Sequence, residues 1–206
     1  YGQSASETKR LLANARDTLL AARNERPRPA RDEKVLAGWN GLMISAFAEA
    51  GLVLDSDYLN RATSALEFVR DVLWDGSRLC RRFRDGDVKV NGYLDDYAFL
   101  AKGALDTYQV SGDPDHLSFA MDLGRVIVDE FADSGSGALY YTPSSGEDLV
   151  ARPQELTDQS TPSSAGVAID TLLALSHFSP NEEFDTVAET ALELYTDRID
   201  ANPLQH

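Results

Sequence analysis

Apolar residues recur at helical spacing in three stretches of the chain. The first stripe is made of Leu59, Ala62, Leu66, Val69 and Leu73. Similar stripes run from Leu117 to Phe131 and from Phe184 to Ile199. A period of about 3.6 residues, with polar residues on the opposite side, predicts amphipathic helices that are each half exposed.

A different kind of helix precedes each of these three. Residues 41–54, 93–108 and 165–175 are apolar on nearly every side, which predicts helices that are buried all round. The repeating unit is therefore an inner helix followed by an outer helix. After each of the first two outer helices we expect a β-hairpin, one in residues 78–91 around Asp85-Gly86 and one in residues 138–152 around Ser145-Gly146.

These units predict an all-α fold, a partial (α/α) toroid with short β-hairpins at the inner-helix mouth. We expect one toroid fragment over residues 1–206, with a leading helix and linker at 1–30 and units at 31–91, 92–152 and 153–206. A closed ring of six such units would need about twice this length. The missing cover would come from the remaining domains of a longer chain or from a second copy.

Composition narrows the classes of partner. The 206 residues are 43% hydrophobic and 26% charged, which is typical of one folded domain, and no run of residues is apolar enough to cross a membrane. The net charge of −15, from 34 acidic and 19 basic side chains, would repel nucleic acid. A single cysteine, Cys80, gives no disulfide or metal-binding spacing, so a cytoplasmic location is expected.

The kind of charge suggests an environment. Twenty-two aspartates stand against only four lysines, and arginine supplies the other 15 cations. Carboxylates remain hydrated in concentrated salt, where screening removes their mutual repulsion, so this balance suggests a halophilic protein. An ordinary acidic surface is the alternative.

Three motifs carry a family resemblance. They are residues 31–43 (RDEKVLAGWNGLM), residues 92–100 (GYLDDYAFL) and residues 152–158 (RPQELTD), the last followed by Thr161-Pro162-Ser163. Together they resemble the helical region of the spermatogenesis-associated thioredoxin-domain family, and the resemblance spans nearly the whole chain without a thioredoxin segment. It implies a six-hairpin toroid, the architecture of several glycosidases and of N-acylglucosamine 2-epimerase. Ser164-Ala165-Gly166 departs from the Gly-Asn-Ser that the family usually has there.

All three motifs precede or open an inner helix, so their polar side chains should converge at one mouth of the toroid. Carboxylates beside aromatic rings are typical of a sugar site, because the rings stack on the sugar and two carboxyls can divide acid from base or nucleophile. The candidate catalytic residues are Asp95 and Asp96 with Asp158. The candidate substrate-binding residues are Trp39, Asn40, Tyr93, Tyr97, Arg152 and Glu155, and the segment Asp32-Glu33-Lys34 should lie nearby.

Each candidate also has a structural interpretation. Asp95 and Asp96 would serve the free N–H groups of a helix first turn, and Asn40 would cap a helix. Trp39 would belong to the core. Arg152 would form an ion pair with Glu155 or Asp158. Lys34 would belong to a solvated run of charges.

Two classes of function therefore remain open: a glycoside hydrolase-like, carbohydrate-active domain, and a non-catalytic scaffold or binding domain. A sugar epimerase is disfavoured because His116 and His177 lie away from the mouth. No metal site is expected, since the carboxylates lack the calcium-loop spacing and no histidine or cysteine joins them. The residues imply no other cofactor.

Overall fold

The computed structural model describes the whole chain except residues 1, 147–149, 180–182 and 202–206. Its described residues form two compact units, residues 1–33 and 34–206, which are treated separately. The first unit contains helix α1 (Ala5–Asn24), none of whose residues is buried. A capping box begins this helix: the Ser4 hydroxyl accepts from the Glu7 amide at 3.3 Å, and Glu7 accepts from the Ser4 amide at 2.8 Å.

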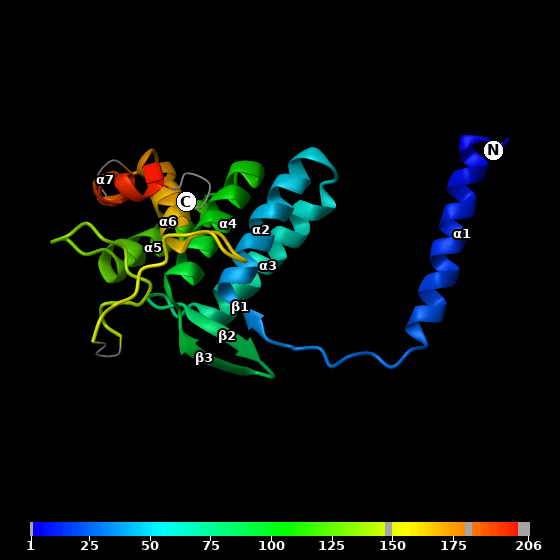
Figure 1. Cartoon of the computed structure of the whole chain (residues 1–206), viewed down its shortest axis with the longest axis horizontal. Coiled ribbons are helices and arrows are strands. Elements are labelled where there is room, and N and C mark those ends of the chain that lie inside the picture. Colours follow the sequence, from blue (N-terminus) through cyan, green and yellow to red (C-terminus); the bar gives the residue numbers. More distant parts are fainter. Residues whose placement is uncertain (1, 147–149, 180–182, 202–206) are drawn as a thin grey trace. The chain divides into compact units, whose positions relative to one another are not determined.

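The second unit contains the predicted inner and outer helices. The inner helices are α2 (Ala37–Val53), α4 (Leu94–Ser111) and α6 (Ser164–Ser176). The outer helices are α3 (Asp57–Leu73), α5 (Pro114–Val126) and α7 (Phe184–Ala201). The partial α/α toroid that the periodicity predicts is confirmed (Figure 1). Helix α2 begins one turn earlier than expected, at Ala37, because the preceding strand ends at Leu36.

Helix α4 is the centre of this unit, packed against α2, α3, α5 and α6. It is buried along most of its length because its apolar residues point to every side. Glycines allow α2 and α4 to approach closely. A Cβ on Gly41 would lie 2.5 Å from the Leu100 nitrogen, and one on Gly103 would lie 2.6 Å from the Gly41 oxygen. Only glycine permits this approach, which brings the first turns of the two helices together.

The first predicted hairpin is confirmed. Strands β2 (Cys80–Arg84) and β3 (Asp87–Asn91) pair antiparallel around Asp85 and Gly86, whose φ angles of 52° and 81° suit a tight hairpin turn. Strand β1 (Val35–Leu36) adds to the other edge of β2, giving the order β1-β2-β3. Because β1 leads into α2 and β3 leads toward α4, the sheet lies at the N-terminal ends of these helices (Figure 1). We call this end of the inner helices the mouth.

The second predicted hairpin is wrong. In residues 138–152, of which 147–149 lie outside the described residues, the structure has no strand and only an isolated bridge between Leu139 and Ala132. The backbone here pairs elsewhere: the amide of Tyr141 donates to the Pro153 oxygen at 2.7 Å, and that of Ser144 donates to the Glu130 oxygen at 2.7 Å. The segment is thus bound to η1 (Ile127–Phe131), the π-helix that continues α5, and to the next loop, and its backbone groups do not pair as a hairpin.

Among the described residues, no helix combines the length and the apolar character that crossing a bilayer requires.

Candidate functional site

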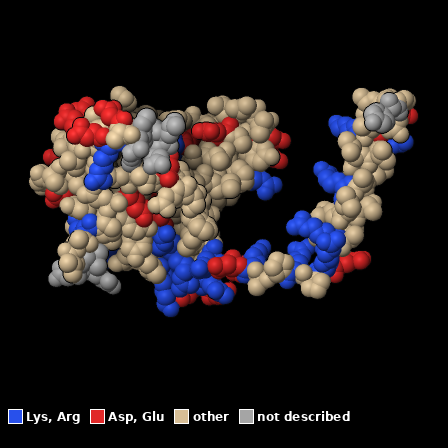
Figure 2. Space-filling view, viewed as in Figure 1, with Lys and Arg blue, Asp and Glu red and all other residues tan. Residues whose placement is uncertain are grey.

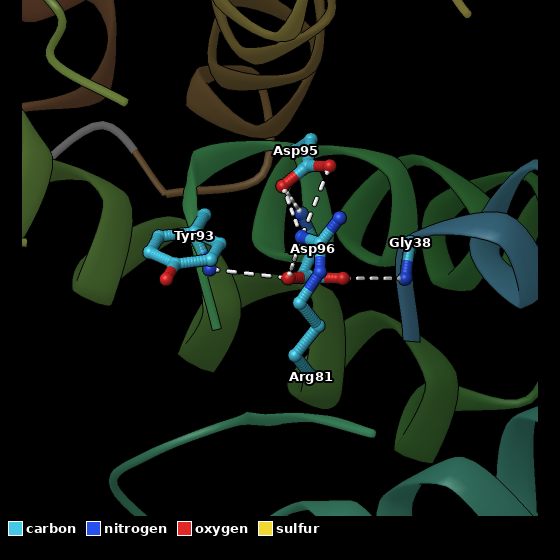
Figure 3. A network of polar contacts seen from close by, with 5 residues as sticks. All are labelled: Gly38, Arg81, Tyr93, Asp95 and Asp96. Atoms are coloured by element: carbon cyan, nitrogen blue, oxygen red, sulfur yellow. Dashed lines mark hydrogen bonds and ion pairs between the residues drawn. The ribbon is translucent and has the colours of Figure 1, made fainter. Parts of the chain in front are cut away.

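The carboxylate of Asp96, in the first turn of α4, is the centre of the polar network at the mouth. Its side chain is 1% exposed. Oδ1 accepts from the Gly38 amide at 2.9 Å, while Oδ2 accepts from the Tyr93 amide at 3.1 Å and from Arg81 Nη1 at 2.6 Å (Figure 3). A carboxylate with three N–H donors is satisfied, as a buried charge must be.

Asp95 shares the same arginine but is more open. Arg81 Nη1 lies 2.9 Å from Oδ1 and 3.1 Å from Oδ2 of Asp95, whose side chain is 15% exposed. Figure 3 shows Arg81, which comes from β2, reaching both consecutive aspartates. One cation therefore orients two carboxylates, one facing inward and one toward the surface of the mouth.

Aromatic rings and a third carboxylate surround this group. The rings of Tyr93 and Tyr141 stack with centroids 5.0 Å apart, and the Arg81 guanidinium lies 5.3 Å from the Tyr93 centroid. Glu155 lies in the loop that leads into α6, where its backbone oxygen accepts from the Ser163 hydroxyl at 3.0 Å. Side chains from β2, from the start of α4 and from the segment after η1 (Ile127–Phe131) thus meet at the mouth.

The charges of this group perturb one another. Burial raises the pKa of Asp96 to about 6; the charge of Asp95 adds to the rise, while Arg81 and the two amides oppose it. Burial and the charge of Asp95 also raise the pKa of Glu155. For Arg81, burial alone would lower the pKa. The hydrogen bond to Asp95 and the charges of both aspartates are stronger than this effect, so the pKa of Arg81 is raised. Burial, followed by the charge of Asp95, raises the pKa of Tyr141.

Trp39 and Asn40 lie on the first turn of α2. Trp39 is 62% exposed, so the expectation that it could belong to the core is wrong. Asn40 does not cap the helix through an amide acceptor: its side-chain nitrogen donates to the Leu36 oxygen at 2.8 Å, and Leu36 is itself the cap residue. Trp39 is therefore available as a surface at the mouth.

Arg152, Asp158 and Tyr97 each form hydrogen bonds with backbone atoms. The predicted ion pair of Arg152 is wrong, because Arg152 donates to the backbone oxygens of Thr142 and Glu130 and lies over the Tyr140 ring. The carboxylate of Asp158 accepts from the Ser163 amide at 2.8 Å, just before α6. Tyr97 is 4% exposed, and its hydroxyl accepts from the buried Leu79 amide at 2.8 Å. The structure does not bring these three side chains together with Asp95.

The remaining predicted charges are solvated. Asp32, Glu33 and Lys34 are exposed, and Glu33 pairs with Arg31 at 2.5 Å. The histidines also have the places expected of them: His116 on α5 is buried against the Ser111 hydroxyl at 3.0 Å, and His177 ends α6. Within the described part of the chain, no three histidine, cysteine or acidic side chains gather as they would around a metal ion.

Sequence reasoning missed Arg81 and Tyr141. The strand pattern did contain a signal for Arg81. Arg81 and Phe83 are two residues apart on β2, so they point to the same side of the sheet, and Phe83 packs there against Phe68 of α3. Tyr141 carried none, since its position depends on the backbone pairing that replaces the second hairpin. Figure 2 shows Lys and Arg gathered where the sheet lies, where β2 and β3 contribute Arg81, Arg82, Arg84 and Lys89.

Comparison with known proteins accounts for the motifs. No family model matches the chain. Spermatogenesis-associated protein 20 of rat and the human protein of the same name are each 31% identical to it over 216 residues, covering 99% of the chain. The chain is a homologue of one segment of these proteins. It spans 27% of the rat protein and 28% of the human one.

Solved structures share the fold. A cellobiose 2-epimerase from Spirochaeta thermophila (TM-score 0.65, 18% identity) matches 83% of the chain and 45% of its own length, and a D-mannose isomerase (0.64, 15%) matches 81% and 46%. An α-1,6-mannanase from Salegentibacter (0.60, 16%) matches 78% and 46%. These are α/α toroid enzymes, so the homologous segment has a fold found among carbohydrate-active proteins.

Proposed function

We propose that the mouth is a carbohydrate site of the glycoside hydrolase type, in which Asp95 is the reacting carboxylate and Glu155 the proton donor. The proposal rests on the place of Asp95, an open carboxylate that Arg81 holds at the mouth beside the stacked rings of Tyr93 and Tyr141. Glu155, from another segment, is exposed, and its pKa is raised by burial and then by the charge of Asp95. Pairs of carboxyls whose environments separate their pKa values divide acid from base or nucleophile.

The roles follow from the partners of each group. Arg81 binds both oxygens of Asp95 and fixes the position of this carboxylate, as a nucleophile or a general base requires. Glu155 has an exposed position and a raised pKa, so it retains a proton more readily than an ordinary glutamate and can give it to a leaving oxygen. Asp96 is too buried to touch a substrate and instead positions Arg81 and α2.

Aromatic surfaces suit the sugar itself. The stacked rings of Tyr93 and Tyr141 and the exposed indole of Trp39 offer flat apolar faces, on which the C–H face of a pyranose ring packs. The mannanase adds support: its solved structure is that of an inactive variant in which two consecutive aspartates are replaced by asparagine, with α-1,6-mannotriose bound. Asp95 and Asp96 are such a consecutive pair in this chain.

A scaffold is the second candidate function, and a specific observation favours it. The oxygens of Asp96 are engaged by Gly38, Tyr93 and Arg81, and Asp158 accepts from Ser163, which is how carboxylates knit helix ends together. In this case the mouth would hold a sugar or a partner segment without turnover. Further helices, from the rest of a longer chain or from a second copy, would complete the ring in either case, since the chain matches under half of each toroid enzyme.

Calorimetric titration and a reducing-end assay on the full chain test the proposal. The probes are D-mannose, cellobiose and α-1,6-mannotriose. We expect binding of at least one sugar, with turnover that falls by about 100-fold or more in Asp95→Asn and Glu155→Gln while binding persists. Asp197→Asn, an exposed change on α7, is the matched control. Binding without turnover would favour the scaffold, and no binding of any probe would overturn the proposal.

A further inference from the structure

A concave site lies beside the end of the hairpin. A groove of about 340 Å³ opens between the turn that follows α3, the end of β3 and the outer wall of α5. Its volume is that of a small-ligand pocket. Trp74, Arg78, Asn91, Asp122, Arg125 and Asp129 are among its lining residues, whereas Trp39, Tyr93, Asp95 and Glu155 of the mouth are not.

One rim of the groove is a rigid turn. The Asp75 carboxylate accepts from the amides of Ser77 and Arg78 at 2.9 and 2.7 Å, and the Asp75 amide donates to the Arg78 oxygen at 3.1 Å. Gly76 permits the turn through its φ of 98°. Arg78 itself is exposed at the groove. Its backbone is thus fixed while its guanidinium stays accessible.

The opposite wall is a π-helix, η1 (Ile127–Phe131), which continues α5. Single π-helical turns are rare and occur often at functional sites, since the wider turn redirects side chains. Here Asp129 and Glu130 line the groove. Glu130 is anchored: its Oε2 accepts from the Ser144 hydroxyl and the Ser145 amide, both at 2.9 Å. Burial alone would raise the pKa of Glu130. The hydrogen bonds from Ser145 and Ser144 and the charge of Arg78 are stronger than this effect, so the pKa is lowered and the charged form is favoured.

The groove is lined by side chains of both charges, an amide and an aromatic ring, and this combination indicates which class of ligand fits. Two guanidinium groups and an amide offer donors, three carboxylates offer acceptors, and an indole is part of the lining. Asp122 and Arg125 already pair at 2.7 Å, so neither sign of charge dominates. An ion would meet repulsion as well as attraction here. A neutral molecule with several hydroxyls finds a donor or an acceptor at each point and an aromatic face for its C–H groups.

We propose that this groove is a second carbohydrate-binding site, for one sugar unit, separate from the mouth and independent of turnover there. Trp74 is one of the residues that line the groove, and its ring packs edge-on against that of Phe119, with centroids 5.9 Å apart. Its indole environment would change when a sugar enters. The chain has only two tryptophans, Trp39 at the mouth and Trp74 at the groove, so each site has its own fluorescent reporter.

Two single-tryptophan proteins make the test. In Trp39→Phe, we expect D-mannose, D-glucose or cellobiose to give a saturable change in Trp74 fluorescence. Adding Asp129→Ala or Arg78→Ala should weaken that binding by about tenfold or more, the effect of one hydrogen bond to a charged group. Both residues are exposed, so the variants should fold, which a circular dichroism melt checks. Asp197→Ala on α7 is the control and should leave binding unchanged.

The outcomes separate this proposal from the one for the mouth. No saturable Trp74 response to any of these sugars, or a response that survives both substitutions, overturns the groove proposal. So does a response to glycine that the sugars do not give, since a zwitterion would then be the ligand. Trp74→Phe leaves Trp39 to report on the mouth. If Trp39 responds and Trp74 does not, the groove proposal fails while the carbohydrate site at the mouth stands.

Discussion

The amide of Gly38 donates a hydrogen bond of 2.9 Å to the Oδ1 atom of Asp96, so the first turns of α2 and α4 are joined by one buried carboxylate. A Cβ at this position would lie 3.1 Å from the same oxygen and 3.2 Å from the Asp95 backbone oxygen, so a larger residue would push these atoms apart by a few tenths of an ångström. The same hydrogen bonds also position Asp95. Because Gly38, Tyr93 and Arg81 fix Asp96, the neighbouring Asp95 lies nearer the surface, bound to Arg81.

Replacing Asp96 by asparagine should destabilise the protein strongly. The asparagine amide group would bring N–H donors to where Tyr93 and Arg81 already donate, and Arg81 would lose half of its compensation. We expect a loss of about 3 kcal/mol in the free energy of unfolding, measured by urea denaturation. Asp197→Asn, which is exposed, should change it by less than about 0.5 kcal/mol. Equal effects of the two changes would show that the Asp96 network contributes nothing.

Stability should fall as the pH rises from about 4 to about 6. The pKa of Asp96 is raised to about 6 in the folded protein, above the ordinary value of about 3.9 that it has when unfolded. The folded state therefore binds the extra proton between these values, and stability from this group is present at low pH and lost as the pH passes through about 6.

Other carboxylates act in the opposite direction at lower pH. The pKa of Asp75 is lowered by hydrogen bonds from the Arg78 amide and from Ser77, and that of Asp133 by hydrogen bonds from Ser136. The stability that these carboxylates contribute is lost as the pH falls below about 4. Urea denaturation at a series of pH values should thus give a maximum near pH 4 to 5. Asp96→Asn should flatten the decline above it, and an unchanged decline in that variant would contradict the assignment.

Two glycine substitutions should have opposite effects. In Gly41→Ala, the new Cβ would lie 2.5 Å from backbone atoms of Leu100 and Phe99, which cannot move without separating α2 from α4. We expect a loss of about 3 kcal/mol or more. In Gly166→Ala, on α6, the nearest atom is 3.5 Å away, so helix propensity should dominate and stabilise the protein by about 0.5 kcal/mol. Thermal melts of both variants provide the comparison.

Two buried tyrosine hydroxyls should contribute equally to stability. The hydroxyl of Tyr97, on α4, accepts from the Leu79 amide, and that of Tyr195, on α7, accepts from the Leu139 amide, each at 2.8 Å. Phenylalanine at either position keeps the ring but leaves a buried N–H without its acceptor. We expect each change to cost about 1 to 2 kcal/mol in the free energy of unfolding. If Tyr97→Phe instead weakened sugar binding without affecting stability, its predicted place in the substrate site would be supported.

The melting temperature should rise between dilute buffer and molar potassium chloride. The net charge of −15 is self-repulsive, and salt screens the repulsion between exposed carboxylates over distances beyond about 10 Å at 0.1 M. Potassium chloride is preferred to a sulfate salt, because sulfate also strengthens apolar burial. A melting temperature that stays constant or falls would refute the halophilic interpretation and leave an ordinary acidic surface.

The sequence alone determined the inner and outer helices, their order and the first hairpin. The inner helices are apolar all round and the outer helices on one side, so the two kinds were distinguishable by periodicity, and Asp85-Gly86 identified the first hairpin. These are local properties, since a helix or a hairpin depends on residues within a few positions. The prediction of the second hairpin was wrong because it used only local information. Residues 138–146 have a strand-like pattern, but their backbone amides donate to the distant oxygens of Glu130 and Pro153.

Only the tertiary structure decided which polar residues form the site. Asp95, Asp96, Asp158 and Arg152 all looked equivalent as polar residues at the mouth, yet the fold gives Asp96 to Gly38, Asp158 to Ser163 and Arg152 to backbone oxygens. Arg81 and Glu155 became the partners of Asp95 because β2 and the loop before α6 are brought beside α4. A local pattern states which face of an element is buried. Which side chain from a distant segment lies opposite depends on how the elements pack, because charge pairing and desolvation act through space.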